Sequence, residues 1–465
     1  MKLPASRSRA LLCLVLGLTA PSALGQTGAQ HWTLSSTLRG TVTDNLLLNS
    51  ESGTDLTSAA TVGLSYSRSQ NRLSFGGFGW ASGGLFGQSG RFNGVRYGLG
   101  GRSELQLGPR AVMNLVASYA DGLNLEDLYA TRLGLPQLDV KAFSATSGLS
   151  YKLTPNTSAG VAFDAFLVRY RTDGSFDSAT LPGDSLMPAD VVPPVDDEPP
   201  VAPPPPGLDL TGQVIGVLAG EGLQTSNLDY WSFRAGANVE HQFSPRTGTT
   251  ASFGYRRAYE QSDAGAAGQQ FEGQFGVRRV LNDSTNLSFF FNEQDSRYPS
   301  RFSSHSLGMS ADKAASRRFR LNASLGASYL QAPERESSGW QLIGGAGLSL
   351  RLKRTSLASS YQRNRYQSLL AARNYTTDSL FVSFGHRFSR RLSLSAYGHG
   401  RAAYEAEDRV GSYRTFLVGT SLGRRFKKRS SLGASYTYQR FHRRPDPPVS
   451  RFVLSAFIGS GLAWK

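Results

Sequence analysis

The sequence of 465 residues contains one cysteine and few charged residues, which make up 18% of the chain. One cysteine excludes a disulfide framework and any metal site built from several thiolates. The mean hydropathy of −0.29 excludes a bundle of transmembrane helices. The six histidines have no metal-ligand spacing, and neither an HExxH motif nor a nucleophile elbow followed by a helix occurs. We therefore expect no metal, no cofactor and no catalytic activity.

The first 25 residues have the pattern of an export signal. Three basic residues, beginning with Lys2, precede an apolar stretch over residues 10–20, and the small residues Ala23 and Gly25 fit cleavage before Gln26. The apolar stretch is shorter than the roughly 20 residues that a membrane-spanning helix needs. We expect residues 1–25 to be a signal peptide and residues 26–465 to be the mature protein, located in the bacterial outer membrane.

Most of the mature chain alternates apolar and polar residues with a period of two. In segment 143–153, Phe143, Leu149 and Tyr151 fall on one face, and Ser144 and Ser150 fall on the other. Segments 32–42, 231–243, 342–352 and 380–388 repeat this pattern. Side chains alternate between the two faces of a strand, so each segment predicts a strand with one apolar and one polar face. We count about 20 such segments, most near the 9–11 residues with which a tilted strand crosses a membrane.

The connections between these segments alternate between short turns, such as 154–156 and 244–246, and longer loops, such as 121–140 and 365–377. This alternation is typical of an up-and-down antiparallel transmembrane β-barrel with short periplasmic turns. The sequence predicts an all-β fold: one monomeric barrel of about 20 strands, with 18 as the neighbouring possibility. The last segment, 452–464, would close against the first. A soluble propeller is the alternative, but its strands tend to be apolar on both faces.

Aromatic residues near the segment ends fit the girdles that anchor such barrels in outer-membrane lipid. The sequence places there Trp32, Tyr66, Tyr119, Tyr151, Trp231, Phe243, Tyr255, Tyr329, Trp340, Phe388, Phe426 and Tyr438.

Residues 172–226 form a long, acidic, proline-rich connection within the barrel. They include ten of the 21 prolines and nine acidic residues but no lysine or arginine. One interpretation is a solvated extracellular loop with a polyproline II stretch. The other is a plug that folds back against basic groups in the lumen. Its candidate residues are Asp184, Asp190, Asp196, Asp197, Glu198, Asp209 and Glu221.

The net charge of +16 suggests an anionic partner. The export signal argues against a nucleic acid as that partner. Part of the surplus lies on the polar strand faces, where rings of arginine and lysine favour anionic solutes. Other basic residues cluster at the short turns, as at 427–429, where they could contact anionic lipid or an acidic periplasmic partner. The predicted lumen-lining residues are Arg39, Arg96, Arg102, Lys152, Arg234, Glu240, Arg256, Arg278, Arg351, Lys353 and Arg387.

The first predicted hairpin carries a family resemblance. A strand runs into Thr43-Asp44-Asn45 and an apolar stretch, and a polar loop, a second strand over 57–68 and a short turn follow. This opening resembles the porin-2-like outer-membrane barrels linked to exopolysaccharide export. The resemblance implies a conduit for a sugar polymer, working with a periplasmic polysaccharide export protein and an inner-membrane synthesis machine. The alternatives are a general anion-preferring diffusion porin and, less favoured, a lipid-modifying enzyme with a Ser–His pair on the barrel wall.

Overall fold

The computed structural model describes residues 29–44, 54–86, 94–122, 139–171, 227–260, 267–297, 301–331, 339–367, 374–405, 413–427, 430–443 and 448–464. The predicted signal peptide and the acidic segment 172–226 lie outside these residues. The described part of the chain is entirely β-structure and turns, and it contains no helix that is long and apolar enough to span a membrane.

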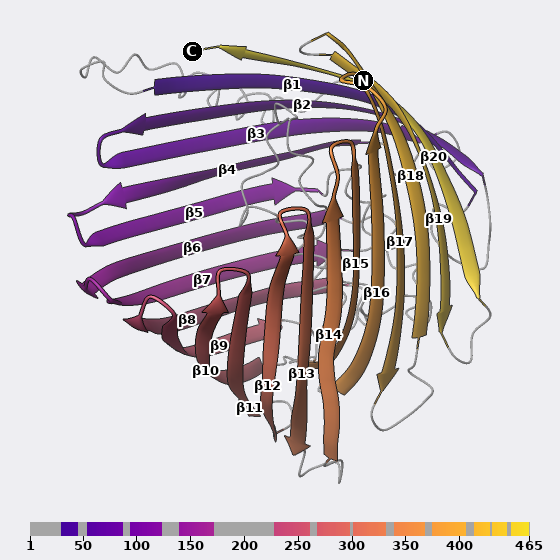
Figure 1. Cartoon of the computed structure of the whole chain (residues 1–465). Helices are drawn as coiled ribbons and strands as arrows, with labels where there is room; N and C mark the ends of the chain where they lie inside the picture. Colours follow the sequence, from indigo (N-terminus) through magenta and orange to yellow (C-terminus); the bar gives the residue numbers. More distant parts are fainter. Residues whose placement is uncertain are drawn as a thin grey trace.

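Twenty strands form one antiparallel sheet that closes on itself (Figure 1). Each strand pairs with its neighbour in sequence, and β1 also pairs with β20, with Thr37 opposite Gly459. The prediction of an up-and-down barrel of about 20 strands is therefore confirmed. The strands are β1 (Ala29–Thr43), β2 (Asp55–Gln70), β3 (Leu73–Phe86), β4 (Gly94–Gln106), β5 (Ala111–Asp121), β6 (Asp139–Thr154), β7 (Thr157–Arg171), β8 (Asn227–Ser244), β9 (Thr247–Glu260), β10 (Ala267–Asn282), β11 (Thr285–Arg297), β12 (Arg301–Ser316), β13 (Phe319–Gln331), β14 (Gly339–Arg351), β15 (Thr355–Gln367), β16 (Asn374–Arg387), β17 (Leu392–Glu405), β18 (Tyr413–Lys427), β19 (Ser430–Arg443) and β20 (Val449–Trp464).

The strands are longer than the sequence predicts. They run from 11 residues in β5 to 18 in β8, against an expected 9–11. Several strands continue into segments that the polarity pattern assigns to loops: β15 extends to Gln367 and β16 begins at Asn374, both inside the predicted loop 365–377. A polar strand end loses its membrane contact but keeps its ladder hydrogen bonds, so the sheet can continue beyond the apolar band. One end of the barrel carries the ends of β1 and β20 and the short turns, such as the one between β2 and β3, and we call it the short-turn end. We call the opposite end the long-loop end.

Alternation along each strand separates an outward apolar face from an inward face of small and polar side chains. Leu38 is outward and 56% exposed, whereas the inward Thr41 is 1% exposed. Inward hydroxyl groups form rungs across neighbouring strands, such as Ser118 to Ser144 with an Oγ–Oγ distance of 3.0 Å. These hydroxyl groups would lack hydrogen-bond partners in the hydrocarbon of the membrane, but on the inner face they bond to one another. Apolar side chains face the lipid instead.

The twelve aromatic residues expected at the strand ends all lie on the outward face. At the short-turn end, the Trp32 and Tyr66 rings are 4.5 Å apart between centroids. At the long-loop end, Trp231 stacks on Tyr259 with a centroid distance of 3.8 Å. Trp340 is 73% exposed, as a ring inserted at a lipid–water boundary would be.

Candidate functional site

The lumen wall is the candidate site, and cross-strand register assigns the predicted residues to it. Partners directly opposite in an antiparallel pair share a face. Lys353 is the one predicted lumen-lining residue that does not lie on the inward face of a strand. Because β14 ends at Arg351, Lys353 is exposed in the turn before β15. The residues on the inward face are Arg39, Arg96, Arg102, Lys152, Arg234, Glu240, Arg256, Arg278, Arg351 and Arg387. The candidate plug residues lie outside the described part of the chain.

A polar network crosses the inner face of β8, β9 and β10. Arg234 donates a hydrogen bond from Nη2 to Glu272 Oε2 at 3.0 Å. Gln270 Nε2 donates to the other carboxylate oxygen at 2.9 Å. Arg256 Nη2 donates to the hydroxyl oxygen of the buried Tyr230 at 2.7 Å. These groups combine fixed positive charge with hydrogen-bonding atoms that face the lumen.

Aromatic rings that were not predicted from the sequence also point into the lumen. Trp80 on β3 lies across Gly98 on β4, because a Cβ at Gly98 would come within 3.0 Å of the indole ring. Four more rings cover a glycine on the neighbouring strand in the same way. The pairs are Phe78 with Gly100, Phe290 with Gly308, Tyr397 with Gly419, and Phe457 with Gly433.

The glycines explain how these rings lie. A glycine has no side chain, so the ring of its cross-strand neighbour can extend over the glycine backbone. Phe78, Phe290 and Tyr397 each stand five residues after the first residue of their strands, which begin at the short-turn end. The rings therefore occupy a similar level on three separated parts of the wall. These rings could have been predicted from the sequence by looking for an aromatic residue on the polar face of one segment and a glycine at the opposite position of the neighbouring segment.

One ring and one predicted arginine come together at the seam of the barrel. The guanidinium carbon of Arg39 on β1 lies 5.5 Å from the centroid of Phe457 on β20. This distance is within the range of a cation–π contact. The closure of the barrel brings them together, since they are 418 positions apart in the sequence.

Histidines do not assemble a catalytic or metal site in the described ranges. Nδ1 of His241 is 2.8 Å from the Thr157 hydroxyl, and Nδ1 of His386 is 2.9 Å from that of Thr355. Both imidazoles face outward at the short-turn end, next to a girdle phenylalanine. No group of three or more His, Cys, Asp or Glu residues is placed to hold a metal ion within the described ranges.

The closed, outward-apolar sheet, with 20 strands in the described part of the chain, defines an outer-membrane β-barrel. No family model matches the sequence, and no curated protein matches it. The porin-2-like resemblance of the first hairpin therefore remains a prediction.

Solved structures are similar to this fold at low sequence identity. The siderophore receptor PirA from Pseudomonas aeruginosa is 11% identical, with a TM-score of 0.51, over 93% of this chain and 80% of that one. A mutant of the ferric enterobactin receptor PfeA from the same organism is 10% identical, with a TM-score of 0.52 and the same coverage. OccAB2 from Acinetobacter baumannii is 10% identical, with a TM-score of 0.40, over 94% of this chain and 98% of that one. At these identities, the two receptors support the barrel fold alone.

Proposed function

We propose that this barrel is a passive outer-membrane conduit and that its cargo is an exported polysaccharide. The observation that carries the proposal is the set of inward rings lying over glycines, together with the polar network on β8–β10. A passive diffusion pore requires only a wetted lumen, whereas aromatic rings on the lumen wall are suited to a ligand with apolar faces of its own.

A sugar ring fits both components of this wall. One face of a pyranose presents C–H groups that can lie on an aromatic ring, and its rim presents hydroxyl groups that exchange hydrogen bonds with charged side chains. Trp80 and Phe78 supply the first kind of contact, and Arg234 and Glu272 supply the second. Repeated weak contacts of this kind would let a chain slide, because no single site holds it tightly.

The proposed partner is a periplasmic polysaccharide export protein that docks at the short-turn end. Basic residues in the turns, such as Arg390 and Arg391, would face an acidic surface on that protein. Anionic headgroups would occupy the same residues when no partner is bound.

A general anion-preferring porin is the second candidate. The inward arginines on β1, β4, β8, β9, β10, β14 and β16 favour it, because basic residues that line a lumen attract anions.

Two measurements test the proposal. Deletion of the gene should abolish or strongly reduce surface polysaccharide, and the wild-type gene should restore it; normal polysaccharide in the deletion strain would refute the conduit. In planar bilayers, the purified barrel should conduct ions, and soluble oligosaccharides should interrupt the current. An anion-selective current that no oligosaccharide interrupts would favour the porin instead.

A further inference from the structure

The outer wall carries a groove of about 460 Å³ at the long-loop end of strands β15–β19. Gly400 and Ala402 of β17 line its floor, and a Cβ at Gly400 would meet no atom within 4 Å. Leu380 on β16 and Phe416 on β18 form its two apolar sides and are 50% and 49% exposed. We call this feature the β17 groove. It lies on the lipid-facing side of the sheet, outside the lumen.

The end of the β17 groove nearest the long loops is cationic. Arg414 lies directly opposite His442, and Arg440 lies directly opposite Phe416. The side chains of Arg414, Arg440 and His442 therefore share the outward face of β18 and β19. Within the part of the chain that the structure describes, none of the three forms a hydrogen bond or ion pair. Arg414 and Arg440 are both exposed.

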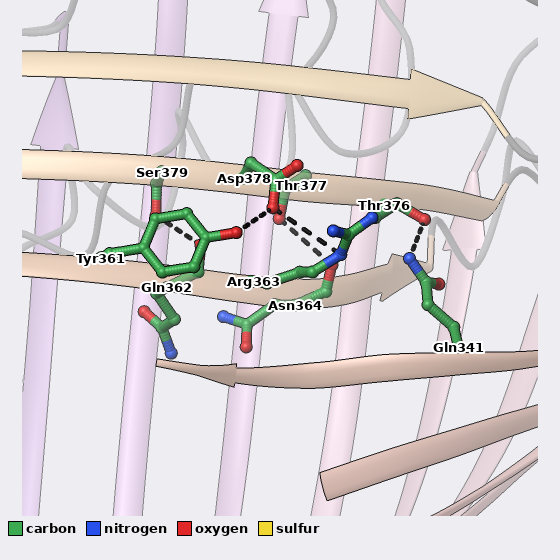
Figure 2. A network of polar contacts seen from close by, with 9 residues as sticks. All are labelled: Gln341, Tyr361, Gln362, Arg363, Asn364, Thr376, Thr377, Asp378 and Ser379. Atoms are coloured by element: carbon green, nitrogen blue, oxygen red, sulfur yellow. Dashed lines mark hydrogen bonds and ion pairs between the residues drawn. The ribbon is translucent and has the colours of Figure 1, made fainter. Parts of the chain in front are cut away.

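Asp378, the acidic residue among the described residues that line the groove, already has partners on β15, across the groove from the cations. Asp378 accepts a hydrogen bond from the Tyr361 hydroxyl at 2.7 Å and lies 3.7 Å from Arg363 Nε (Figure 2). Asp378 on β16 is separated from Arg414 on β18 by β17, where Ala402 lies opposite both residues. The carboxylate is thus held on the β15–β16 side, and it is the one acidic group among the described residues that line the β17 groove.

Other outward cations near the long-loop end do have acidic partners. Arg169 pairs with Asp229 and Arg297 pairs with Asp295, both at 3.1 Å. These pairs show that the barrel supplies carboxylates for outward arginines elsewhere at this level. The β17 groove differs because its cations stand beside an apolar trough.

We propose that the β17 groove binds a phosphorylated lipid of the outer leaflet. The long-loop end of such barrels faces outward from the cell, which places the groove at the outer-leaflet headgroups. The lipid phosphate would bind between Arg414 and Arg440, which as diagonal neighbours are expected about 7–8 Å apart, with their Cβ atoms somewhat closer. One acyl chain would run along Gly400 toward Gly398, between Leu380 and the side chains of β18.

The ligand is identified by two requirements that one molecule must meet. Two unpaired guanidinium groups require an anion with several acceptor oxygens, and phosphate meets that need with bidentate geometry. A trough floored by glycine and alanine and flanked by leucine and phenylalanine requires a hydrocarbon chain. A neutral lipid satisfies only the second requirement, and free phosphate satisfies only the first.

Native mass spectrometry of the full-length barrel in neutral detergent tests this proposal. Lipid A with two phosphates is the probe, and phosphatidylcholine and inorganic pyrophosphate are the comparison ligands. Lipid A should be retained most strongly. The double variant R414Q/R440Q should bind it about 25-fold more weakly, since each basic residue near anionic lipid contributes about fivefold.

Two further variants separate the parts of the site. G400L should fill the trough and weaken lipid A binding, while R424Q, on the same outward face of β18 but at the short-turn end, should bind it as the wild type does. Circular dichroism verifies that each variant keeps its β-structure. Unchanged binding by R414Q/R440Q, or by folded G400L, would overturn the proposal. Equal binding of lipid A and phosphatidylcholine by the wild type would overturn it too.

Discussion

Arg234 on β8 reaches across β9 to Glu272 on β10, and the two side chains meet above Gly254. The Nη2–Oε2 distance is 3.0 Å, and a Cβ on Gly254 would lie 3.7 Å from both Arg234 Nε and Glu272 Oε2. The glycine leaves the space through which the bridge passes. The bridge connects strands that share no ladder hydrogen bonds and places one positive and one negative group on the same patch of the lumen wall.

Removing the carboxylate of this bridge should make the channel more anion-selective. In E272Q, Arg234 keeps its charge while its acidic partner is lost, so the inward wall gains net positive charge. A unit charge about 10 Å from an ion in water contributes about 0.4 kcal/mol, which is about twofold for each ion and of opposite sign for chloride and potassium, so the chloride-to-potassium permeability ratio should rise about fourfold. Reversal potentials in planar bilayers measure it. E293Q removes an outward carboxylate instead and should leave the ratio unchanged; an equal shift in both variants would contradict the prediction.

Removing the Trp80 ring should weaken the interaction of the lumen with sugar chains. In W80A, the platform over Gly98 is lost, and aromatic contacts contribute about 0.5–1.5 kcal/mol each. The oligosaccharide concentration that half-blocks the bilayer current should rise about three- to tenfold. W340A removes an outward tryptophan that is 73% exposed, so its block should match the wild type. If W80A is blocked as readily as the wild type, the rings are not the sugar platform.

A side chain at Gly98 should displace the same ring without removing it. In G98V, the added Cβ would lie within 3.0 Å of the indole, and overpacking of this kind costs about 1–3 kcal/mol. We expect a lower urea midpoint of unfolding and weaker block by oligosaccharides. At Gly83, on β3, an added Cβ would meet nothing within 4 Å, so G83V is the matched control. Equal losses of stability in the two variants would show that the contact with Trp80 is unimportant.

Deleting residues 172–226 distinguishes the two interpretations of the acidic segment. A plug predicts a channel whose conductance rises on deletion, because the acidic residues no longer occupy a basic lumen. A solvated extracellular loop predicts an unchanged conductance, and that result would exclude the plug. Single-channel currents of the intact and shortened chains, recorded at the same salt concentration, provide the comparison.

Closure of the barrel can be tested by a cross-link across the seam. The hydroxyl oxygens of Ser36 on β1 and Ser460 on β20 are 3.0 Å apart. Because directly opposite positions suit disulfide geometry, S36C/S460C should form an intramolecular bond on mild oxidation. Electrophoresis with and without reductant should show a mobility difference for the double variant and none for either single variant. Failure of the folded double variant to cross-link would contradict a β1–β20 seam.

The sequence predicted the barrel because its signal is local. Each strand alternates apolar and polar residues, and the lengths of the connections alternate as well, so the up-and-down order follows from neighbouring segments. The outward girdle residues, such as Trp231 and Trp340, were predicted for the same reason. The ends of strands were predicted less well, since β8 and β9 continue through polar residues that no longer contact lipid.

The composition of the lumen wall depends on register, which no single segment contains. Trp80 could be taken as an outward girdle residue until its pairing with Gly98 placed it on the inner face. Arg39 and Phe457 come from opposite ends of the chain and meet only because β1 pairs with β20. Alternation within each strand is enough to specify a barrel with an apolar exterior, because it is a local property of the amino-acid sequence. Which rings, glycines and charges become neighbours depends on the tertiary structure, because contacts across strands arise only when the strands pair.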